Sequence, residues 1–346
     1  MKQFIVLQNE AGQRLDKLLF KILDKAPKSF IYKMLRKKNI VLNGKKADGS
    51  EKLQVNDEIK MFLSDETIEK FRGTADSTIV EYEFNIIYED SHLLIVNKPL
   101  GVLSQKADKK DVSMVEYILS YLLTTKQLTS EQLISFKPGI CNRLDRNTSG
   151  LLIAGKSLLG LQEMASLLKN RALDKYYLCI VKGRVEGKKR IEGFLSKNEA
   201  KNTVTIHKEK TKDSEYICTE YEPLQYSKRK ENTNNSRQNT LDNSWKSAEG
   251  FGDYTLLQVK LITGRSHQIR AHLASIGNPI IGDYKYGDPK TNHYFKLNYQ
   301  LEHQLLHSYR MVFPTIEGNL SYLSRKEFIC EVPEKFKKIQ KDLFTY

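Results

Sequence analysis

The first 63 residues alternate apolar and polar positions in a way that predicts a small unit of two helices and a few short strands. Apolar residues at 15, 18, 19, 22 and 23 form one face of a helix over 14–23. Ser29 would cap a second helix with apolar positions 30, 31, 34 and 35. A strand is expected at 40–42, followed by an Asn-Gly tight turn, and alternation over 53–63 predicts a strand pair.

Residues 64–78 are polar and charged and predict a linker, after which longer apolar runs predict buried strands separated by amphipathic helices. The expected strands are 84–90, 93–99, 151–154, 176–181, 201–207 and 254–262, and the expected helices are 115–122, 158–168 and 265–276. This order predicts an α+β protein with two domains, residues 1–75 including the linker and residues 76–346.

One stretch interrupts the second domain. Residues 226–250 contain almost no apolar side chains and many Asn, Ser and Lys. Such a composition predicts a long mobile insertion between strands. Its five Lys and Arg residues could reach an RNA backbone, although a tolerated surface loop is the simpler interpretation.

The charge of the chain points to an anionic partner. The 346 residues carry 56 Lys and Arg against 42 Asp and Glu, a formal net charge of +14, and the sequence pI is about 9.3. A protein this basic is expected to bind a polyanion. The sequence has no apolar run of the roughly 18–20 residues that a membrane helix needs, and its first ten residues have too short an apolar core for a signal peptide. Four cysteines spaced far apart favour a reducing, cytoplasmic location and argue against a zinc site.

Basic residues gather in the first domain. They are expected on one face of the second helix and beside the following turn: Lys33, Arg36, Lys37, Lys38, Lys45 and Lys46. Lysines on a helix are usually only its solvated face, but a cluster that joins a helix and a turn favours phosphate binding. The segments RLDKLL and SFIYKMLRKKNIVLNGKK, within residues 13–63, resemble the small αL-type RNA-binding domain of ribosomal protein S-four and tyrosyl-tRNA synthetases.

A single carboxylate stands out in the second domain. Asp145 lies between Arg143 and Arg146, followed by polar turn formers and the apolar run 151–154, which predicts a loop and then a buried strand. Opposite charge close by keeps a carboxylate ionised. Asp145 therefore suits a nucleophile or an ion-pair anchor better than a proton-donating general acid.

Two other motifs are expected to be structural. Residues 150–157, GLLIAGKS, match the phosphate-loop pattern, but the four spacer residues predict a strand where that motif needs an open glycine-rich loop. A buried strand ending at Gly155, with Ser157 capping the next helix, explains the segment. The histidines of HQLLH at 303–307 have no third ligand nearby and lack the glutamate of a metalloprotease motif, so we expect no metal.

Three segments of the second domain resemble the RluA-type family of pseudouridine synthases. Residues 142–152, NRLDRNTSGLL, follow the family pattern H-R-L-D-x-x-T-S-G-L-L, with Asn142 where histidine is usual. Residues 175–183 follow K-x-Y-x-A-x-V-x-G with Cys179 in place of alanine, and 263–273 follow T-G-R-x-H-Q-I-R-x-H-L throughout. Shorter matches are NKPLG at 97–101, IGDYKYG at 281–287 and LLHSYRMVFP at 305–314.

The resemblance, over about residues 84–335, implies a catalytic domain built on a mixed, mainly antiparallel β-sheet with flanking helices. It implies isomerisation of specific uridines to pseudouridine by a monomer with no cofactor or metal. A lone carboxylate suits an isomerase, because glycoside hydrolysis uses two. With its N-terminal unit the chain is most similar to the branch that modifies 23S large-subunit ribosomal RNA or its assembly intermediates. The competing interpretation is a catalytically inactive RNA-binding assembly factor, which Asn142 and the insertion would favour.

The resemblance also implies roles for individual residues. Asp145 would attack C1′ of the uridine ribose or remove a ribose proton, and the residues leave both routes open. Tyr177 would stack on the extruded base and could accept the C5 proton, and Arg270 would pair with Asp145. Arg143 would help to hold the displaced nucleotide. Further RNA contacts are expected from Arg146, Arg265, His267 and Gln268.

Overall fold

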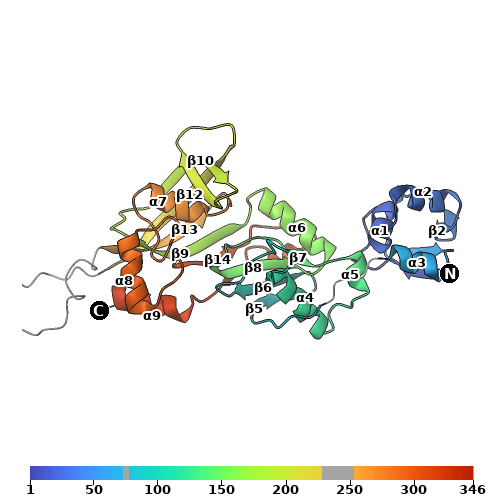
Figure 1. The fold of residues 1–346 in the computed structure, drawn as a ribbon, viewed down its shortest axis with the longest axis horizontal. Helices are drawn as coiled ribbons and strands as arrows, with labels where there is room; N and C mark the ends of the chain where they lie inside the picture. The colour runs from blue at the N-terminus through green and yellow to red at the C-terminus, as the bar shows by residue number, and fades with distance from the viewer. Residues whose placement is uncertain (73–77, 228–252, 346) are drawn as a thin grey trace, which may run out of the picture.

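A computed structural model describes residues 1–72, 78–227 and 253–345, which form two sheets with their helices (Figure 1). The predicted boundary at 75/76 lies outside the described residues. Of the insertion predicted at 226–250, only Tyr226 and Ser227 are described, and Tyr226 ends a strand. In the part of the chain that the structure describes, no helix is long and apolar enough to span a membrane.

The N-terminal unit is a four-stranded sheet with the strand order β1-β4-β2-β3, packed against helices. Its elements are β1 (Lys2–Ile5), α1 (Leu15–Ile22), α2 (Lys28–Arg36), β2 (Ile40–Leu42), β3 (Lys45–Lys46), β4 (Glu58–Met61) and α3 (Asp65–Phe71). Apolar faces of α1 and α2 and the buried positions of β2 and β4 form one core. The two helices predicted from apolar spacing are therefore confirmed.

Three local predictions in this unit are wrong. The expected linker begins with a helix, α3, whose N-terminus is capped by the Ser64 hydroxyl accepting from the Thr67 amide, and whose Ile68 is buried. Helix α2 starts at Lys28 after Pro27, with no side-chain cap from Ser29. Of the strand pair expected over 53–63, only Glu58–Met61 is a strand. Each miss concerns a short element that tertiary packing stabilises more than its own periodicity does.

The second unit contains a large sheet with the order β11-β10-β12-β13-β9-β14-β8-β6-β5. Its pairs are antiparallel except for β14 with β8, which confirms a mixed, mainly antiparallel sheet. The strands of this order are β5 (Asn85–Glu89), β6 (Leu93–Lys98), β8 (Ser149–Gly155), β9 (Asp174–Lys182), β10 (Lys189–Asn198), β11 (Thr203–His207), β12 (Ser214–Tyr226), β13 (Tyr254–Leu261) and β14 (Leu306–Val312). Two short strands add to it, β7 (Gly139–Ile140) beside β8 and β15 (Glu327–Ile329) beside β14.

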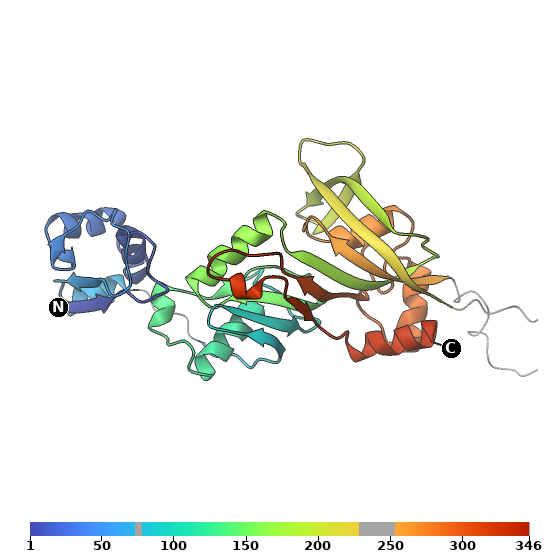
Figure 2. The ribbon, with the colours of Figure 1, turned by 180° about the vertical axis from the view of Figure 1, so that it is seen from behind.

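Helices cover this sheet and close its ends (Figures 1 and 2). They are α4 (Met114–Thr124), α5 (Gln132–Ser135), α6 (Leu158–Lys169), α7 (Gln268–Ser275), α8 (Pro289–Tyr299), the 3₁₀ turn η2 (Ser321–Leu323) and α9 (Glu334–Phe344). Ser157 caps α6 by accepting from the Gly160 amide, as predicted. Helix α7 starts three residues later than predicted, because His267 has a left-handed backbone with φ of 55°.

The centre of the sheet fixes the loop that carries Asp145. Gly150 in β8 has φ of +112°, and a Cβ there would lie 2.2 Å from the backbone oxygen of Ser308 in β14. Only glycine allows this close approach. The loop that precedes β8 is therefore held beside β14. Strand β9 pairs with the other edge of β14.

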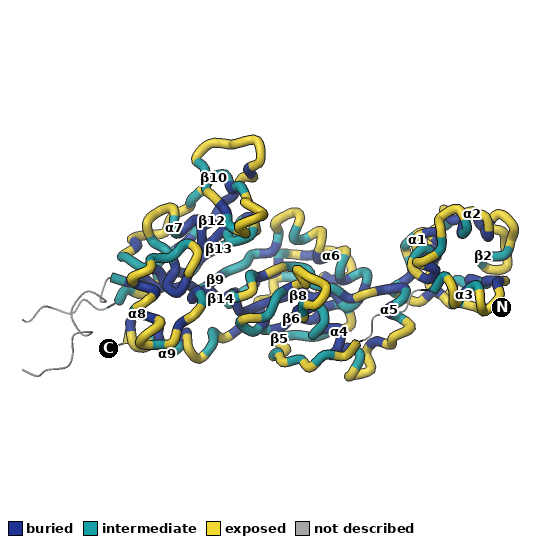
Figure 3. The backbone as a smooth tube through the Cα atoms, viewed as in Figure 1, coloured by how far each residue is buried: buried dark blue, intermediate teal, exposed yellow. Residues whose placement is uncertain are grey.

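The N-terminal unit lies at one end of the elongated molecule, next to α5 (Figures 1 and 2). The Ser135 hydroxyl of α5 donates to the buried Glu10 carboxylate at 2.5 Å, and the Leu158 amide donates to the Asn9 side chain at 3.2 Å. Both units have buried interiors of their own, as Figure 3 shows. These bonds therefore join two separately packed bodies.

Candidate active site

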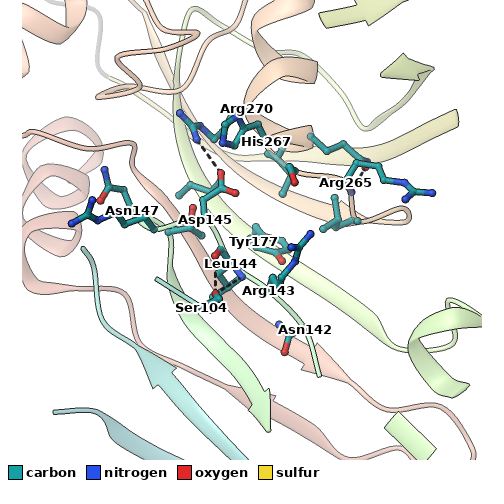
Figure 4. A pocket seen from close by; sticks show the side chains of 18 of the residues that line it. Ser104, Asn142, Arg143, Leu144, Asp145, Asn147, Tyr177, Arg265, His267 and Arg270 are labelled. Carbon is teal, nitrogen blue, oxygen red and sulfur yellow. Dashed lines mark hydrogen bonds and ion pairs between the residues drawn. The ribbon is translucent and has the colours of Figure 1, made fainter. Parts of the chain in front are cut away.

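A cleft of about 900 Å³ opens where the Asp145 loop faces β9 and the start of α7. Its walls come from segments far apart in the chain: 103–105, 141–148, 168–177, 261–270, 282–285 and 302–306. Figure 4 shows that Asp145, Tyr177 and Arg270 meet within it. The structure thus brings together the three side chains that the resemblance assigns to catalysis.

The Asp145 loop is held by backbone bonds on both sides of the carboxylate. The Ser104 hydroxyl donates to the Leu144 carbonyl at 2.7 Å and accepts from the Leu144 amide at 2.9 Å. The Thr148 amide donates to the Asp145 carbonyl at 3.0 Å. The Asp145 side chain remains 23% exposed, so its carboxylate is fixed but reachable from the cleft. No sequence signal pointed to Ser104.

Arg270 is shared between two aspartates. Its Nη1 donates to Asp145 at 3.0 Å, while Nε and Nη2 donate to the two oxygens of Asp283 at 2.7 and 2.9 Å. Burial alone would lower the pKa of Arg270, but the two carboxylates outweigh it and raise that pKa. Burial would likewise raise the pKa of Asp283, yet the bonds from Arg270 lower it. Arg270 and Asp283 are therefore both expected to be charged.

Asp283 was not predicted as a site residue, although it lies in the matched segment IGDYKYG. Its carboxylate also accepts from the backbone amides of Lys285 and Tyr286, at 2.9 and 3.1 Å. The side chain is 1% exposed, so it does not reach into the cleft itself. Asp283 orients Arg270, which in turn meets Asp145.

Tyr177 projects from β9 beside Asp145 and is nearly buried (Figure 4). Burial raises the pKa of its phenol, and the nearby Asp145 adds to this, against a lowering by Ser308. The phenol therefore stays protonated around neutral pH. The two roles expected for Tyr177, stacking on the base and acceptance of the C5 proton, stay predictions.

Lys98 is a further residue that the sequence interpretation missed, although it is part of NKPLG. Its ammonium is fully buried and donates to the carbonyls of Pro99, Val102 and Arg146 at 2.8, 2.7 and 3.1 Å. Burial lowers the pKa of Lys98 to about 7, against the opposing effect of Asp145. Lys98 ties the turn after β6 to the residue that follows Asp145.

The arginines of the cleft that are expected to contact RNA differ in whether the protein itself already binds their side chains. Arg143 is exposed, and in Figure 4 it lies on the other side of Asp145 from Arg270. The Arg146 Nε donates to the Gly101 carbonyl at 2.9 Å, and Arg265 pairs with Glu215 at 2.5 Å. Arg143 is thus the cation among these three that has no partner within the described residues.

His267 and Gln268 form the turn into α7. The His267 Nδ1 is 2.9 Å from the Tyr286 hydroxyl, and burial lowers the pKa of this histidine. Gln268 is 1% exposed; its amide accepts from Thr263 and donates to the Cys218 carbonyl at 3.0 Å. The Gln268 amide is used inside the protein, so the RNA contact predicted for it would require these bonds to break.

The six basic residues predicted to bind phosphate lie in the N-terminal unit and not in the cleft. Four belong to α2 and the turn after it, and two form β3: Lys33, Arg36, Lys37, Lys38, Lys45 and Lys46. All six are exposed, and none has an ion pair within the described residues. We call these six residues the N-terminal basic surface.

The phosphate-loop match is a strand, as predicted, since β8 spans Ser149–Gly155 and is buried throughout. The Lys156 ammonium pairs with Glu89 at 2.7 Å and is not available to a nucleotide. His307 lies in β14 with its ring between the Ser149 hydroxyl and the Cys330 carbonyl. Within the described ranges, no group of three or more His, Cys, Asp or Glu side chains could hold a metal ion.

Asn142, the departure from the family pattern, supports β8. Its side-chain oxygen accepts from the Ile153 amide at 2.8 Å, and its Nδ2 donates to the Leu151 carbonyl at 3.4 Å. Asn142 therefore holds the start of the loop without touching the Asp145–Arg270 pair. Its presence gives no support to an inactive site.

The chain belongs to the RNA pseudouridylate synthase family, whose model matches residues 92–275, just over half of the sequence. It is therefore a pseudouridine synthase, an isomerase, as the resemblance implied. A second family model, the S4 domain, matches residues 13–59 and confirms the N-terminal RNA-binding module.

Individual relatives agree with this assignment. The ribosomal large subunit pseudouridine synthase C of Vibrio cholerae is 28% identical over 90% of this chain and 88% of its own length. The ribosomal large subunit pseudouridine synthase D of Borreliella burgdorferi is 31% identical over 72% of this chain and 66% of its own length. The solved structure of human RNA pseudouridylate synthase domain containing 4 shares the fold, with a TM-score of 0.53 at 17% identity, covering 74% of this chain and 91% of that one.

Proposed function

We propose that this enzyme isomerises uridines of 23S large-subunit ribosomal RNA, with Asp145 as the nucleophile. The observation that carries the chemistry is the Asp145 carboxylate, 23% exposed at the cleft and bonded at 3.0 Å to an arginine that is itself locked by Asp283. A carboxylate so held is fixed in direction and remains open to the cleft. Preorganised groups of this kind avoid the cost of reorientation during the reaction.

The reaction balances with this chain's own residues and the RNA. An Asp145 oxygen bonds to C1′ as the N1–C1′ bond breaks, and the uracil leaves with the electron pair. The base turns so that C5 bonds to C1′ and expels the carboxylate. The proton on C5 is then lost while N1 gains one, so no redox partner and no net water take part.

Arg270 and Tyr177 support this sequence in different ways. Arg270 holds the Asp145 carboxylate in place before the attack and pairs with it again after its expulsion. Tyr177, protonated and projecting from β9 beside Asp145, offers its ring to the extruded base. Extrusion costs a few kcal/mol, which stacking and phosphate contacts offset.

The choice of ribosomal RNA rests on two kinds of support. Relatives that match 90% and 72% of this chain carry the name ribosomal large subunit pseudouridine synthase. The N-terminal basic surface supplies exposed cations outside the cleft, as a large folded RNA would require. We therefore propose that residues 1–75 dock the RNA and that residues 76–346 carry out the isomerisation.

The experiment is incubation with a 23S ribosomal RNA transcript, followed by mapping of pseudouridine. Wild type and Asp342→Asn, an exposed change on α9, should give the same modified positions, and Asp145→Asn should give none. Product from Asp145→Asn would remove Asp145 from the mechanism. Modification of another RNA but not of this transcript would contradict the proposal that 23S ribosomal RNA is the substrate. It would not contradict the proposed reaction at Asp145.

Two further measurements separate the alternatives. A rate lowered by deuterium at C2′ of the target uridine would favour removal of a ribose proton over attack at C1′. An assembly factor without chemistry would bind RNA as tightly with Asp145→Ala as without it and would make no pseudouridine in either form. If the protein is an enzyme, wild type and Asp145→Ala should bind the RNA with equal affinity, and only Asp145→Ala should fail to make pseudouridine.

A further inference from the structure

The cleft is far more basic than the catalytic residues require. Eight Lys and Arg side chains line it, against two acids, Asp145 and Glu302. The eight are Arg143, Arg146, Lys169, Arg171, Lys175, Arg265, Arg270 and Lys285. Like charges gathered in one concavity repel each other, so such a wall indicates an anionic occupant.

Four of the eight cations are already used by the protein. Arg270 pairs with its two aspartates, and Arg265 with Glu215 at 2.5 Å. Arg146 donates to the Gly101 carbonyl at 2.9 Å, and Lys285 to the Asn202 carbonyl at 2.6 Å. These interactions fix the loops that surround the catalytic carboxylate.

The other four have no ion pair and no side-chain hydrogen bond within the described residues: Arg143, Lys169, Arg171 and Lys175. Three of them come from a single short stretch, the end of α6 and the start of β9. The free charge of the cleft is therefore concentrated on one wall.

Lys175 connects this wall to the opposite one. A Cβ placed on Gly264 would lie 3.6 Å from the Lys175 ammonium, so that ammonium faces the turn before α7. Burial lowers the pKa of Lys175, and the nearby Arg171 lowers it further. Arg171 and the half-buried Lys175 therefore lie close together, and neither forms an ion pair with a carboxylate within the described residues.

Arg171 occupies a left-handed backbone position at the end of α6, where glycine is the usual residue. It follows α6 with φ of 55°, and its amide donates to the Leu168 carbonyl while the Ala172 amide donates to that of Leu167. Helix ends of this kind favour glycine or asparagine, although α2 and α4 also end on a lysine in this conformation, Lys38 and Lys126. The helix dipole attracts cations and accounts for Lys169. It does not account for Lys175, which lies on a strand and faces the cleft.

We propose that Arg171 and Lys175, with Lys169 and Arg143, form a subsite for the sugar–phosphate backbone of the RNA strand next to the extruded uridine. The inference rests on the proposed function and names the part of the substrate that this wall holds. Arg143 connects the subsite to the catalytic loop, on the side of Asp145 away from Arg270 (Figure 4). The subsite positions the strand and takes no part in bond making.

The sharpest test is Arg171→Gly, with Arg325→Gly as its matched control. Both arginines have a positive φ, 55° and 59°, and both changes remove one charge from an exposed residue, but Arg325 lies away from the cleft. Glycine relieves the backbone at either position, so neither variant should unfold at a lower temperature than wild type. A defect confined to Arg171→Gly would therefore come from the missing guanidinium and not from a damaged fold.

The measurement is equilibrium binding of a 23S transcript across a salt series. Arg171→Gly should bind about tenfold more weakly, as expected when a charge-assisted bond to the RNA is removed. Its log–log salt dependence should be shallower by about 0.7–0.9. Arg325→Gly should match wild type in both. If the two variants bind the RNA equally weakly, or if the salt dependence of Arg171→Gly equals that of wild type, the proposed backbone subsite is wrong.

Lys175→Met provides a second, independent variant, because methionine keeps the apolar stem and removes the charge. With saturating enzyme, its single-turnover rate of pseudouridine formation should match wild type, while half-saturation should require about tenfold more enzyme. A lowered rate at saturation would assign Lys175 to the chemistry and contradict a positioning role. Binding does not depend on turnover, so a wild type that binds the transcript but makes no pseudouridine in it would overturn the proposed substrate alone.

Discussion

Arg270 and Asp283 form a buried ion pair with two hydrogen bonds, of 2.7 and 2.9 Å, and this pair leaves one edge of the guanidinium for Asp145. The two aspartates therefore divide the arginine between them. Asp283, which is nearly inaccessible to solvent, fixes the orientation of the Arg270 guanidinium. Asp145, which is open to the cleft, pairs with the remaining edge of that guanidinium.

Replacing Asp283 with asparagine should disable the site without touching the cleft. The amide NH₂ would face a guanidinium donor, and breaking a buried pair typically costs about 3–5 kcal/mol of stability. A misdirected Arg270 would release Asp145, and misplacement by an ångström costs about a hundredfold in rate. Denaturant unfolding and single-turnover pseudouridine formation would measure both effects.

Asp288→Asn is the control for that variant, because it makes the same change at the N-cap of α8, at a residue that does not line the cleft. Asparagine caps a helix about as well as aspartate does, so this control should lose little stability and keep the wild-type rate. A wild-type rate in folded Asp283→Asn would show that Arg270 needs no second carboxylate.

Lys98→Met should loosen the turn beside Asp145 and change how stability depends on pH. Burial lowers the pKa of Lys98 to about 7, below the ordinary lysine value near 10.4. Between those two pH values the unfolded chain binds the extra proton, so Lys98 makes stability rise with pH in that window. Urea unfolding at pH 7, 8.5 and 10 should show a smaller rise for Lys98→Met than for wild type.

The same variant leaves the carbonyls of Pro99, Val102 and Arg146 without their shared donor, so its rate should fall as well. Lys189→Met, at an exposed lysine of β10, should reproduce wild type in stability and rate. Identical pH profiles for Lys98→Met and wild type would mean that Lys98 keeps an ordinary pKa.

Mild acid should destabilise the protein through two buried histidines. Burial lowers the pKa values of His272 and His307 to about 4, from 6.5. The unfolded chain takes up these protons first, so stability is lost as pH falls from 6.5 to 4, by up to about 3 kcal/mol for each histidine. Denaturant unfolding at pH 7, 6 and 5 would measure the loss.

His307→Gln should lower the starting stability but make the fall between pH 7 and 5 shallower. The exposed His293 of α8 provides the matched change, and His293→Gln should keep the full wild-type fall. Parallel pH profiles for all three proteins would rule out His307 as a source of the acid sensitivity.

The N-terminal basic surface should set part of the salt dependence of RNA binding. Lys37→Gln with Lys38→Gln removes two of its exposed charges, and each phosphate that is no longer neutralised makes the log–log slope shallower by about 0.7–0.9. Salt-series binding to the 23S transcript would measure this. Saturating single-turnover rates should not change, since these lysines lie outside the cleft.

Lys338→Gln with Lys341→Gln removes the same charge from α9 and should leave the slope as it is. If both double variants behave like wild type, the lysines of the N-terminal unit form only a solvated face.

Much of the fold follows from local pattern. The strand at β8 and the Ser157 cap of α6 were predictable, because side-chain period and capping depend on residues a few positions apart. Helix α3 was missed because Ile68 is its one buried residue, and a single buried position makes no periodic signal. The ordered motifs also identified Asp145, Tyr177 and Arg270 before any interaction between them was known.

The sequence by itself therefore determined many of the elements, the family and the choice of the three central side chains, because each depends on short-range order. Only the tertiary structure decided that Asp283 directs Arg270, that Lys98 holds the neighbouring turn, and which cleft cations have no ion pair among the residues that the structure describes. Residues 98, 145, 270 and 283 meet through the packing of strands and a helix that lie far apart in the chain. Burial and charge pairing are properties of that packing, so local sequence does not contain them.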